Sequence, residues 1–327
     1  MDILIIKLGA LGDVVNTLPL AVRLKQHLSA RIHWITEPLS FPILSRHPSV
    51  DHAILFDRPR WKESLPGVVR EARSRRFDIA LDLQRIAKSA LLCMASSSGR
   101  RIGFDRARCK EMTWLMPFER IAPYDRTSHM VNQYLEFADY LQVPREEPQW
   151  AIPEGDPLPV SLPGAYVVLN IGATKPANRW TPGGFSSLAG LIAERYRIPC
   201  VLTGGREDRQ TAEAITGEAK TPLIDLVGRT TIMELVTVLS GADAVVTCDT
   251  GPMHLAVSLG KEVIALFGPA DPRRTGPYRG RVIRKDLPCI PCNKRSCDDP
   301  ECMTSILPED IMEELKPILE GTVTNSL

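Results

Sequence analysis

Two runs of alternating strand-like and helix-like segments, separated by one proline-rich stretch, shape this sequence. The stretch 144–163 contains six prolines, namely Pro144, Pro148, Pro153, Pro157, Pro159 and Pro163. Proline disrupts helix interiors and central strands, so we predict that this stretch is a linker. The alternation on either side of it predicts βαβ units, and therefore a parallel sheet in each half of the chain.

The predicted strands are short apolar runs with helical patterns between them. In the first half they cover 3–8, 31–36, 51–56, 77–83 and 101–104, with helices over 13–28 and 127–141. In the second half they cover 166–171, 199–203, 223–226, 244–248 and 263–267, with a last helix over 308–319. We predict an α/β fold of two Rossmann-like domains, residues 1–150 and 151–327. A ligand cleft is expected between them, at the carboxyl ends of the strands.

Length and charge limit the possibilities only broadly. The chain has 327 residues, more than one core usually organises, and its formal net charge of +1 does not indicate a partner. The apolar run at the amino terminus is interrupted at Lys7 and lacks a basic start, unlike a signal peptide. No run approaches the roughly 20 apolar residues that span a bilayer. We therefore expect a cytoplasmic protein.

The segment after the first predicted strand carries two glycines and an acid. Gly9 and Gly12 allow a tight turn and a close approach of the backbone to a ligand, and Asp13 lies at the helix start. An ionised Asp13 could accept a proton from a substrate hydroxyl. The alternative is that Asp13 is only an N-cap. The glycine spacing is not GxGxxG, and no acid clearly ends the second strand, which disfavours a dinucleotide site.

The second half contains a strand that runs into Asp249-Thr250-Gly251-Pro252, followed by an amphipathic helix. Free N–H groups and the helix dipole make such a helix start an anion site, and Gly251 lets a phosphate come close. Pro252 suits a first helical turn because its missing N–H is not needed there. His254 falls in that turn and could point at the same anion, although a histidine there is often only a surface or capping residue.

Neighbouring loops in the second half offer polar groups at successive strand ends. The loop 172–180 carries Thr174, Lys175 and Arg179, and the loop 203–208 carries Gly204 and Glu207. Each loop alone could be a plain turn. Together they supply the glycine, hydroxyl and cationic groups that a nucleotide diphosphate needs. Because the chain has no Asp-x-Asp pair, we expect no obligatory metal for the diphosphate.

Several motifs resemble those of the ADP-heptose:lipopolysaccharide heptosyltransferases, glycosyltransferase family nine. They are Leu-Gly-Ala-Leu-Gly-Asp at 8–13, Asp-Thr-Gly-Pro-Met-His-Leu-Ala at 249–256, Leu-Phe-Gly-Pro at 266–269 and Thr-Gly-Pro-Tyr at 275–278. The resemblance spans nearly the whole chain. It implies the GT-B architecture, with two parallel sheets facing across a cleft, the acceptor on the first domain and ADP-heptose on the second. It also implies an inverting single displacement onto the inner core of lipopolysaccharide.

The resemblance assigns roles to particular residues. Asp13 matches the base that deprotonates the acceptor hydroxyl. The donor motif supplies Asp249, Thr250, Gly251, Met253 and His254, of which Thr250, Gly251 and His254 match phosphate contacts. Glu207 or Asp208 falls where the family places an acid near the nucleoside. The chain departs from the family at Asn178, where many members have a lysine two residues before the tryptophan. Arg179 or Lys175 could substitute for it.

The stretch 58–110 is strongly basic, with 14 Lys and Arg against 5 Asp and Glu, or +9. The stretch could be a plain solvated face, but it could also attract an anionic, lipid-linked saccharide at the inner-membrane surface. No nucleic-acid motif accompanies the charge, so we expect no nucleic acid as a partner. The expected partners are a nucleotide-sugar donor and this acceptor. We expect a monomer.

Four of the eight cysteines are clustered: Cys289, Cys292, Cys297 and Cys302. That number of thiols could bind zinc or an iron–sulfur centre, but the spacing is not a clean pair of CxxC motifs. We interpret them as a structural cluster, with or without a metal. The other four cysteines are scattered and fit buried thiols.

Two rival functions remain open. A sugar-nucleotide epimerase or hydrolase on the same scaffold would turn over the donor without an acceptor. A non-catalytic nucleotide- or lipid-binding module would bind a nucleotide without turnover and would not depend on Asp13. The presence of both Asp13 and the segment 249–251 favours the transferase.

Overall fold

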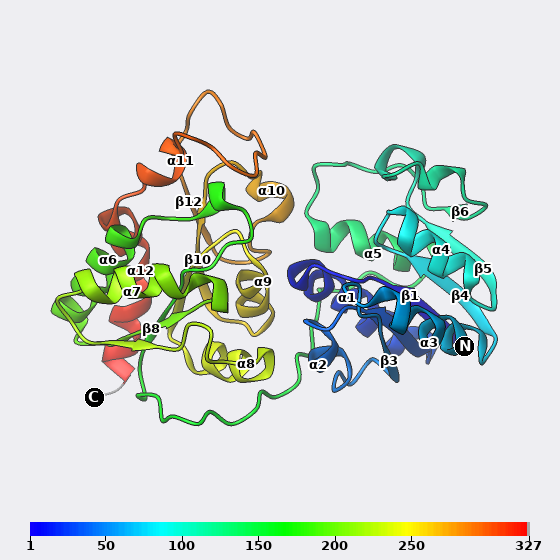
Figure 1. The fold of residues 1–327 in the computed structure, drawn as a ribbon, viewed down its shortest axis with the longest axis horizontal. Coiled ribbons are helices and arrows are strands. Elements are labelled where there is room, and N and C mark those ends of the chain that lie inside the picture. The colour runs from blue at the N-terminus through cyan, green and yellow to red at the C-terminus, as the bar shows by residue number, and fades with distance from the viewer. Residues whose placement is uncertain (326–327) are drawn as a thin grey trace. The chain divides into compact units, whose positions relative to one another are not determined.

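The computed structural model describes residues 1–325, and side chains through residue 321. The chain divides into two compact units, Met1–Pro153 and Glu154–Leu327. Their boundary lies inside the proline-rich stretch, where residues 144–163 form neither helix nor strand, as the prolines predict (Figure 1). Each unit has its own parallel sheet.

The first unit contains a six-stranded sheet in the order β3-β2-β1-β4-β5-β6, in which every pair of neighbours is parallel. Its strands are β1 (Asp2–Ile6), β2 (Arg31–Thr36), β3 (His52–Leu55), β4 (Phe77–Asp82), β5 (Ser98–Gly103) and β6 (Glu119–Arg120). Its α-helices are α1 (Leu11–Leu28), α2 (Phe41–Leu44), α3 (Trp61–Arg73), α4 (Ala87–Ala95) and α5 (Met130–Tyr140). Short 3-10 turns cover Arg106–Arg108 and Thr113–Leu115.

Alternation along the strands separates the two faces of this sheet. Leu4 and Ile6 of β1 belong to an apolar cluster with residues of α3 and α4, such as Val68 and Leu92. Successive strand residues point to opposite faces, so Ile3 and Ile5 face the other side. All four side chains are completely buried, which explains why β1 is apolar throughout.

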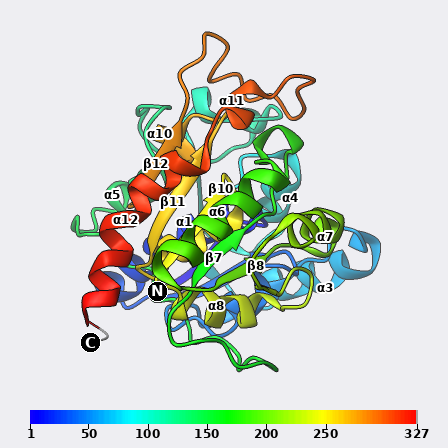
Figure 2. The same cartoon turned by 90° about the vertical axis from the view of Figure 1, so that its left-hand side faces the viewer.

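The second unit repeats the topology with the order β12-β11-β10-β7-β8-β9, again all parallel. Its strands are β7 (Val167–Asn170), β8 (Cys200–Thr203), β9 (Leu223–Asp225), β10 (Ala244–Cys248), β11 (Glu262–Phe267) and β12 (Arg281–Arg284). Its α-helices are α6 (Pro182–Tyr196), α7 (Arg209–Glu218), α8 (Ile232–Gly241), α9 (Gly251–Ser258), α10 (Pro272–Thr275), α11 (Glu301–Thr304) and α12 (Pro308–Asn325). Helices α6 and α12 pack side by side over one face of the sheet (Figure 2).

When the strands are counted within each unit, both sheets have the same strand order, 3-2-1-4-5-6. This is the doubly wound order of a Rossmann-like domain. The predicted strands are all present, with ends shifted by at most three residues. Two edge strands, β6 and β12, were not predicted, because each is short and rich in charged residues.

Candidate active site

In a doubly wound sheet, the loops after the first and fourth strands diverge to opposite faces and leave a crevice at the carboxyl edge. In the first unit these strands are β1 and β4, which pair directly. The loop after β1 carries Gly9 and leads to Asp13, while Gln84 and Arg85 follow β4. The backbone N–H of Leu8 donates to Oε1 of Gln84 at 3.2 Å, which ties the two loops together.

Asp13 lies in the first turn of α1, as its third residue. The N-cap position belongs to Ala10, so Asp13 is not the N-cap that the alternative interpretation assumed. Gly12 also differs from the prediction, because it is a buried residue inside the helix and not part of the loop. Of the two glycines, only Gly9 lies in the loop itself.

Two buried side chains contact the Asp13 carboxylate. Nζ of Lys7 donates to Oδ2 and the hydroxyl of Tyr134 donates to Oδ1, both at 3.1 Å. Lys7 is almost completely buried, whereas the side chain of Asp13 is 38% exposed. Asp13 is thus held from inside the protein and still reaches solvent.

The electrostatic surroundings keep this carboxylate ionised. Burial by itself would raise the pKa of Asp13, but the charge and hydrogen bond of Lys7, the charge of Arg85 and the hydrogen bond of Tyr134 outweigh it. The net effect is a pKa below the usual range. Sequence reasoning missed Lys7, Tyr134 and Arg85, although a lysine at the end of an apolar strand is an unusual residue there.

An acidic residue does follow the second strand, contrary to the sequence-based interpretation. Glu37 comes directly after β2, and its N–H donates to the carbonyl of Leu8 at 2.9 Å. A Cβ atom on Gly9 would lie 3.5 Å from Oε2 of Glu37, an ordinary van der Waals distance, so Gly9 and this carboxylate are direct neighbours. Burial raises the pKa of Glu37, while Arg58, 3.2 Å away, opposes that rise.

The equivalent crevice of the second unit lies after β7 and β10, which also pair directly. Asn170 connects the ends of these strands, because its amide donates to Oγ1 of Thr247 at 3.1 Å and of Thr250 at 3.4 Å. The hydroxyl of Thr203, at the end of β8, donates back to Asn170 at 3.2 Å. The buried amide therefore holds the loop ends of three strands in register.

Helix α9 begins at this crevice. Thr250 is its N-cap in extended conformation, and no side chain caps the helix there. The N–H groups of a first helical turn lack partners within the helix, so they can bind an anion. His254 is largely buried in this helix. Met253 departs from the predicted set, because the whole residue is buried and no part of it is exposed to solvent.

Charged groups surround Asp249, the residue before this helix start. Burial raises the pKa of Asp249 to about 6, although the charge of Lys175 and a hydrogen bond from Asn178 oppose that rise. The Asn178 amide donates to Asp249 at 3.1 Å. Many members of the family that the sequence resembles have a lysine at position 178. Here the neutral side chain of Asn178 takes that position and hydrogen-bonds to Asp249.

The two predicted cations of the loop after β7 differ in their surroundings. Arg179 forms an ion pair with the buried Asp208 at 2.7 Å and donates to the carbonyl of Ala173 at 3.2 Å. Lys175 is half-buried, and its charge is felt by Asp249. Thr174, in the same loop, is exposed. Of these two cations, only Lys175 affects the pKa of Asp249, the acid just before the α9 helix start.

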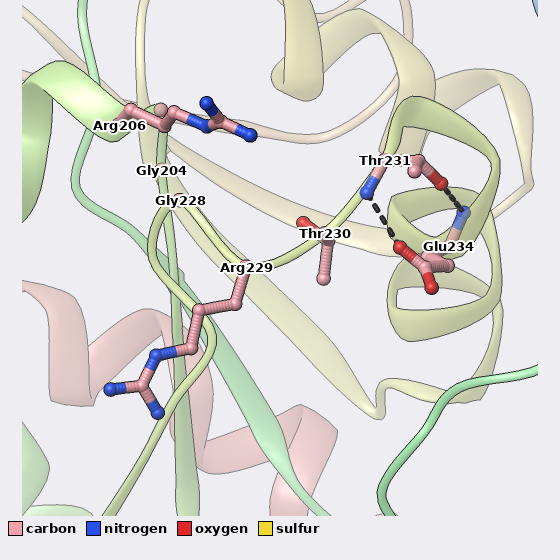
Figure 3. A pocket seen from close by; sticks show the side chains of 8 residues that line it. Gly204, Arg206, Gly228, Arg229, Thr230, Thr231 and Glu234 are labelled. Atoms are coloured by element: carbon pink, nitrogen blue, oxygen red, sulfur yellow. Dashed lines mark hydrogen bonds between the residues drawn. The ribbon is translucent and has the colours of Figure 1, made fainter.

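A pocket of about 390 Å³ opens beside these loops, at the ends of β8 and β9. It is lined by Gly204, Gly205, Arg206, Gly228, Arg229, Thr230, Thr231 and Glu234. Figure 3 shows Arg206 and Arg229 extending from separate loops, while Thr231 and Glu234 form the capping hydrogen bonds of α8. Gly228 has a φ of +68°, and a side chain there would meet the backbone of Arg206 at 3.0 Å.

Glu207 does not line this pocket, although it neighbours two residues that do. It lies in the 3-10 turn Arg206–Asp208, and its carboxylate occupies the space that a side chain on Gly205 would take. Asp208, the other predicted acid, is buried and paired with Arg179. Only Glu207 of the two is exposed to solvent.

Comparison with known proteins identifies the family. Residues 67–302 match the model of glycosyltransferase family 9 (heptosyltransferase). The chain belongs to this family. It is 29% identical to lipopolysaccharide heptosyltransferase 1 of Pseudomonas aeruginosa, over 98% of each chain. A family 9 glycosyltransferase of Veillonella parvula has the same fold, with a TM-score of 0.83, 20% identity, and coverage of 98% of this chain and 97% of that one.

The Escherichia coli heptosyltransferase WaaC, solved with ADP, is also similar in fold, with a TM-score of 0.79 and 23% identity over 97% of this chain and all of that one. The prediction of a GT-B enzyme with two Rossmann-like domains is thus confirmed, and this chain is a glycosyltransferase. Among the described residues of this glycosyltransferase, no helix is both long and apolar enough to cross a bilayer.

The four clustered cysteines of the glycosyltransferase line one cavity of about 310 Å³, together with Ile290 and Pro269. Cys302 is buried, whereas Cys289 and Cys297 are exposed. Burial raises the pKa of Cys302, and the other three thiols add to the rise, since all four face the same space. Within the described part of the chain, no three His, Cys, Asp or Glu side chains are placed to hold a metal ion. The thiols gather, but not as a preformed metal site.

Proposed function

We propose that this glycosyltransferase moves a heptose from ADP-heptose to the inner core of lipopolysaccharide, on the cytoplasmic face of the membrane. The family, and the lipopolysaccharide heptosyltransferases among its relatives, support the sugar and the acceptor. The observation that carries the mechanism is the Asp13 carboxylate, which is held ionised by Lys7 and is 38% exposed at the carboxyl edge of the first sheet. A general base needs both properties.

The proposed reaction is a single inverting displacement. The acceptor hydroxyl gives its proton to Asp13 while its oxygen attacks the anomeric carbon of the heptose. The bond from that carbon to the diphosphate oxygen breaks, and ADP leaves with the electron pair. The first turn of α9, with Thr250 and Gly251, and the charge of Lys175 stabilise the negative charge on ADP.

The pocket beside Gly204 and Gly228 is the proposed nucleoside site. Its volume of about 390 Å³ suits a flat base with its ribose, and it lies at the strand ends next to the α9 crevice. Glycines at these positions keep the walls thin enough for a ring to lie against the backbone. Glu207 is exposed beside the pocket and could accept a hydrogen bond from a ribose hydroxyl.

The test is a mass-spectrometric assay with ADP-heptose and a heptose-deficient lipopolysaccharide. We expect heptose on the acceptor only when both substrates are present, and no loss when EDTA is added. The variant Asp13→Ala should lose transfer but still bind ADP. As a control, Asp139→Ala removes a 28% exposed aspartate of α5 that is paired with Arg23, and it should retain activity.

Three outcomes would contradict the proposal. Turnover of ADP-heptose without an acceptor would indicate an epimerase or hydrolase. ADP binding without turnover, unchanged by Asp13→Ala, would indicate a binding module. Full transfer by Asp13→Ala would show that Asp13 is not the base, although the protein would still be a transferase.

A further inference from the structure

Two neighbouring segments of the first unit expose large apolar side chains. Leu91 and Met94 lie on α4, and Met112, Trp114 and Leu115 lie on the segment after β5, all between 37% and 62% exposed. We call these five residues the apolar patch. Scattered exposed apolar residues are ordinary, but five on two adjoining segments indicate a surface that meets a partner.

Two hydrogen bonds from backbone N–H groups join α4 to the segment after β5. The N–H of Ala87, at the start of α4, donates to the Glu111 carboxylate at 3.0 Å. The N–H of Lys110 donates to the carbonyl of Arg85 at 3.1 Å. Leu91 lies one helical turn beyond Ala87, so it projects from the part of α4 nearest to residues 110–115. The two halves of the apolar patch therefore belong to one region of the surface.

The segment does not need these side chains for its own packing. Arg108 is buried and binds both carboxylate oxygens of Glu136 on α5, at 2.6 and 2.8 Å, and also contacts Asp105. Arg120 donates to the carbonyl of Thr113 at 2.7 Å, and Thr113 itself is buried. Polar contacts thus fix the inner side of the segment, and the apolar side chains on either side of Thr113 point outward.

Cations flank the apolar patch. The guanidinium of Arg106 stacks over the Trp114 ring at 4.2 Å. Lys88 is exposed on α4, three residues before Leu91 and so on the same helical face. Both lie in the stretch 58–110, whose formal charge is +9. Apolar side chains with tryptophan and rim cations form the composition of a surface that rests in an anionic membrane interface.

The position of the patch relative to Asp13 indicates what the contact is for. Helix α4 follows β4 and the segment follows β5, so both leave the carboxyl edge at which Asp13 lies. Arg85, which anchors the segment through its carbonyl, is also close enough to Asp13 to affect its titration. The apolar patch and Asp13 therefore belong to one unit, on elements that begin at the same edge of its sheet.

We propose that the apolar patch, with Lys88 and Arg106, inserts into the interface of an anionic bilayer and so brings Asp13 to a lipid-anchored acceptor. This inference rests on the proposed function for the acceptor, but the membrane contact can be measured without it. The occupant is a bilayer and not a second protein, because the cations at the rim complement anionic headgroups.

The first experiment measures sedimentation of the full chain with vesicles, without any substrate. Vesicles of equimolar phosphatidylcholine and phosphatidylglycerol are compared with pure phosphatidylcholine. Leu91→Ser with Leu115→Ser should weaken binding about tenfold or more on the anionic vesicles. The matched control is Val160→Ser with Leu307→Ser, because these residues are 46% and 53% exposed in the second unit. This control should bind like the wild type.

Charge variants test the second half of the inference. Lys88→Gln and Arg106→Gln should each weaken binding to the anionic vesicles about fivefold, and less at high salt, while binding to phosphatidylcholine stays unchanged. Thermal unfolding of every variant is compared with the wild type, so that a folding defect is recognised. Equal binding by the wild type and the Leu91/Leu115 variant would overturn the inference.

Activity separates this inference from the proposed function. The Leu91/Leu115 variant should lose transfer to a vesicle-embedded acceptor but retain it with a water-soluble saccharide lacking lipid chains. Failure of the wild type to transfer to either acceptor would refute the proposed function and leave the binding result standing. A wild-type dimer in light scattering that the patch variant dissociates would show a protein interface and also overturn the inference.

Discussion

Replacing Lys7 by methionine tests whether this buried cation keeps the Asp13 carboxylate ready to accept a proton. Methionine fills nearly the same volume but has no charge. Nζ of Lys7 lies 3.1 Å from Oδ2 of Asp13. Two unit charges at about 4 Å attract by about 4 kcal/mol at an effective dielectric of 20, and by about 1 kcal/mol in water. Because Asp13 is 38% exposed, solvent screens the pair, and we take about 2 kcal/mol.

Loss of this attraction should appear in the pH dependence of transfer. Without Lys7 the pKa of Asp13 rises, so less carboxylate is ionised at a given pH and the acidic limb of kcat/KM moves to higher pH. At pH values below the acidic limb of the variant, we expect its kcat/KM to be about 30-fold lower than that of the wild type, which corresponds to about 2 kcal/mol. At higher pH Asp13 is ionised again, and the loss should shrink.

The assay is kcat/KM of Lys7→Met and wild type from about pH 4 to about pH 8, a range that includes the acidic limb of the variant. Lys25→Met is the matched control. Lys25 lies on α1 and, like Lys7, forms an ion pair with an aspartate, in this case Asp51 at 2.7 Å. This control should leave the profile in place. If Lys7→Met lowers kcat/KM by the same factor at every pH, Lys7 acts through structure and not through the charge of Asp13.

Three further predictions concern stability and thiol reactivity. Asp249→Asn should stabilise the protein by about 1–2 kcal/mol at pH 8 in urea unfolding, and the gain should fade below about pH 6, because burial disfavours only the ionised form; an equal gain at all pH values would refute this. Arg108→Met should cost about 3–5 kcal/mol in the same assay by leaving Glu136 without its counter-charge; a cost near zero would contradict a structural clamp. Iodoacetamide should label Cys297 in the native protein but Cys248, whose pKa burial raises to about 12, only after unfolding; native labelling of Cys248 would contradict its burial.

The strand pattern could be predicted from sequence because buried parallel strands are continuous apolar runs. Strands such as β10 (Ala244–Cys248) are apolar over nearly their whole length and have one clear end. The edge strands β6 and β12 lack this signal, because both are short and rich in charged residues. β12 reads Arg-Val-Ile-Arg and was missed for that reason. The helix start at α9 was predictable because Thr-Gly-Pro is a local signal.

The support around Asp13 could not be predicted, because it comes from residues distant along the chain. Tyr134 lies 121 residues away on α5 and reaches Asp13 only because α1 and α5 pack together. Lys7 is close in sequence, but its burial depends on the whole sheet around β1. Pairing between a charged residue and its distant partner is a property of the packed fold and not of a local pattern.

The choice between Lys175 and Arg179 as the cation for the diphosphate follows from what each already binds. Arg179 is paired with the buried Asp208 at 2.7 Å, so contact with a ligand would have to compete with that pair. Among the described residues, no hydrogen bond or ion pair within 4 Å engages the ammonium group of Lys175, although its charge acts on Asp249. Lys175 can therefore turn to a phosphate without leaving a buried acid unpaired.

Matched glutamine variants separate the two roles. Lys175→Gln should weaken ADP binding in calorimetry by about tenfold, the effect of one charge-assisted hydrogen bond, and leave the unfolding midpoint unchanged. Arg179→Gln should do the reverse. It should lower the free energy of unfolding by about 3 kcal/mol, because Asp208 stays buried without a counter-charge. The folded variant should bind ADP with an affinity within about twofold of the wild type. If Arg179→Gln instead weakens ADP binding more than Lys175→Gln does, the arginine leaves Asp208 when the nucleotide arrives, and the assignment of Lys175 is wrong.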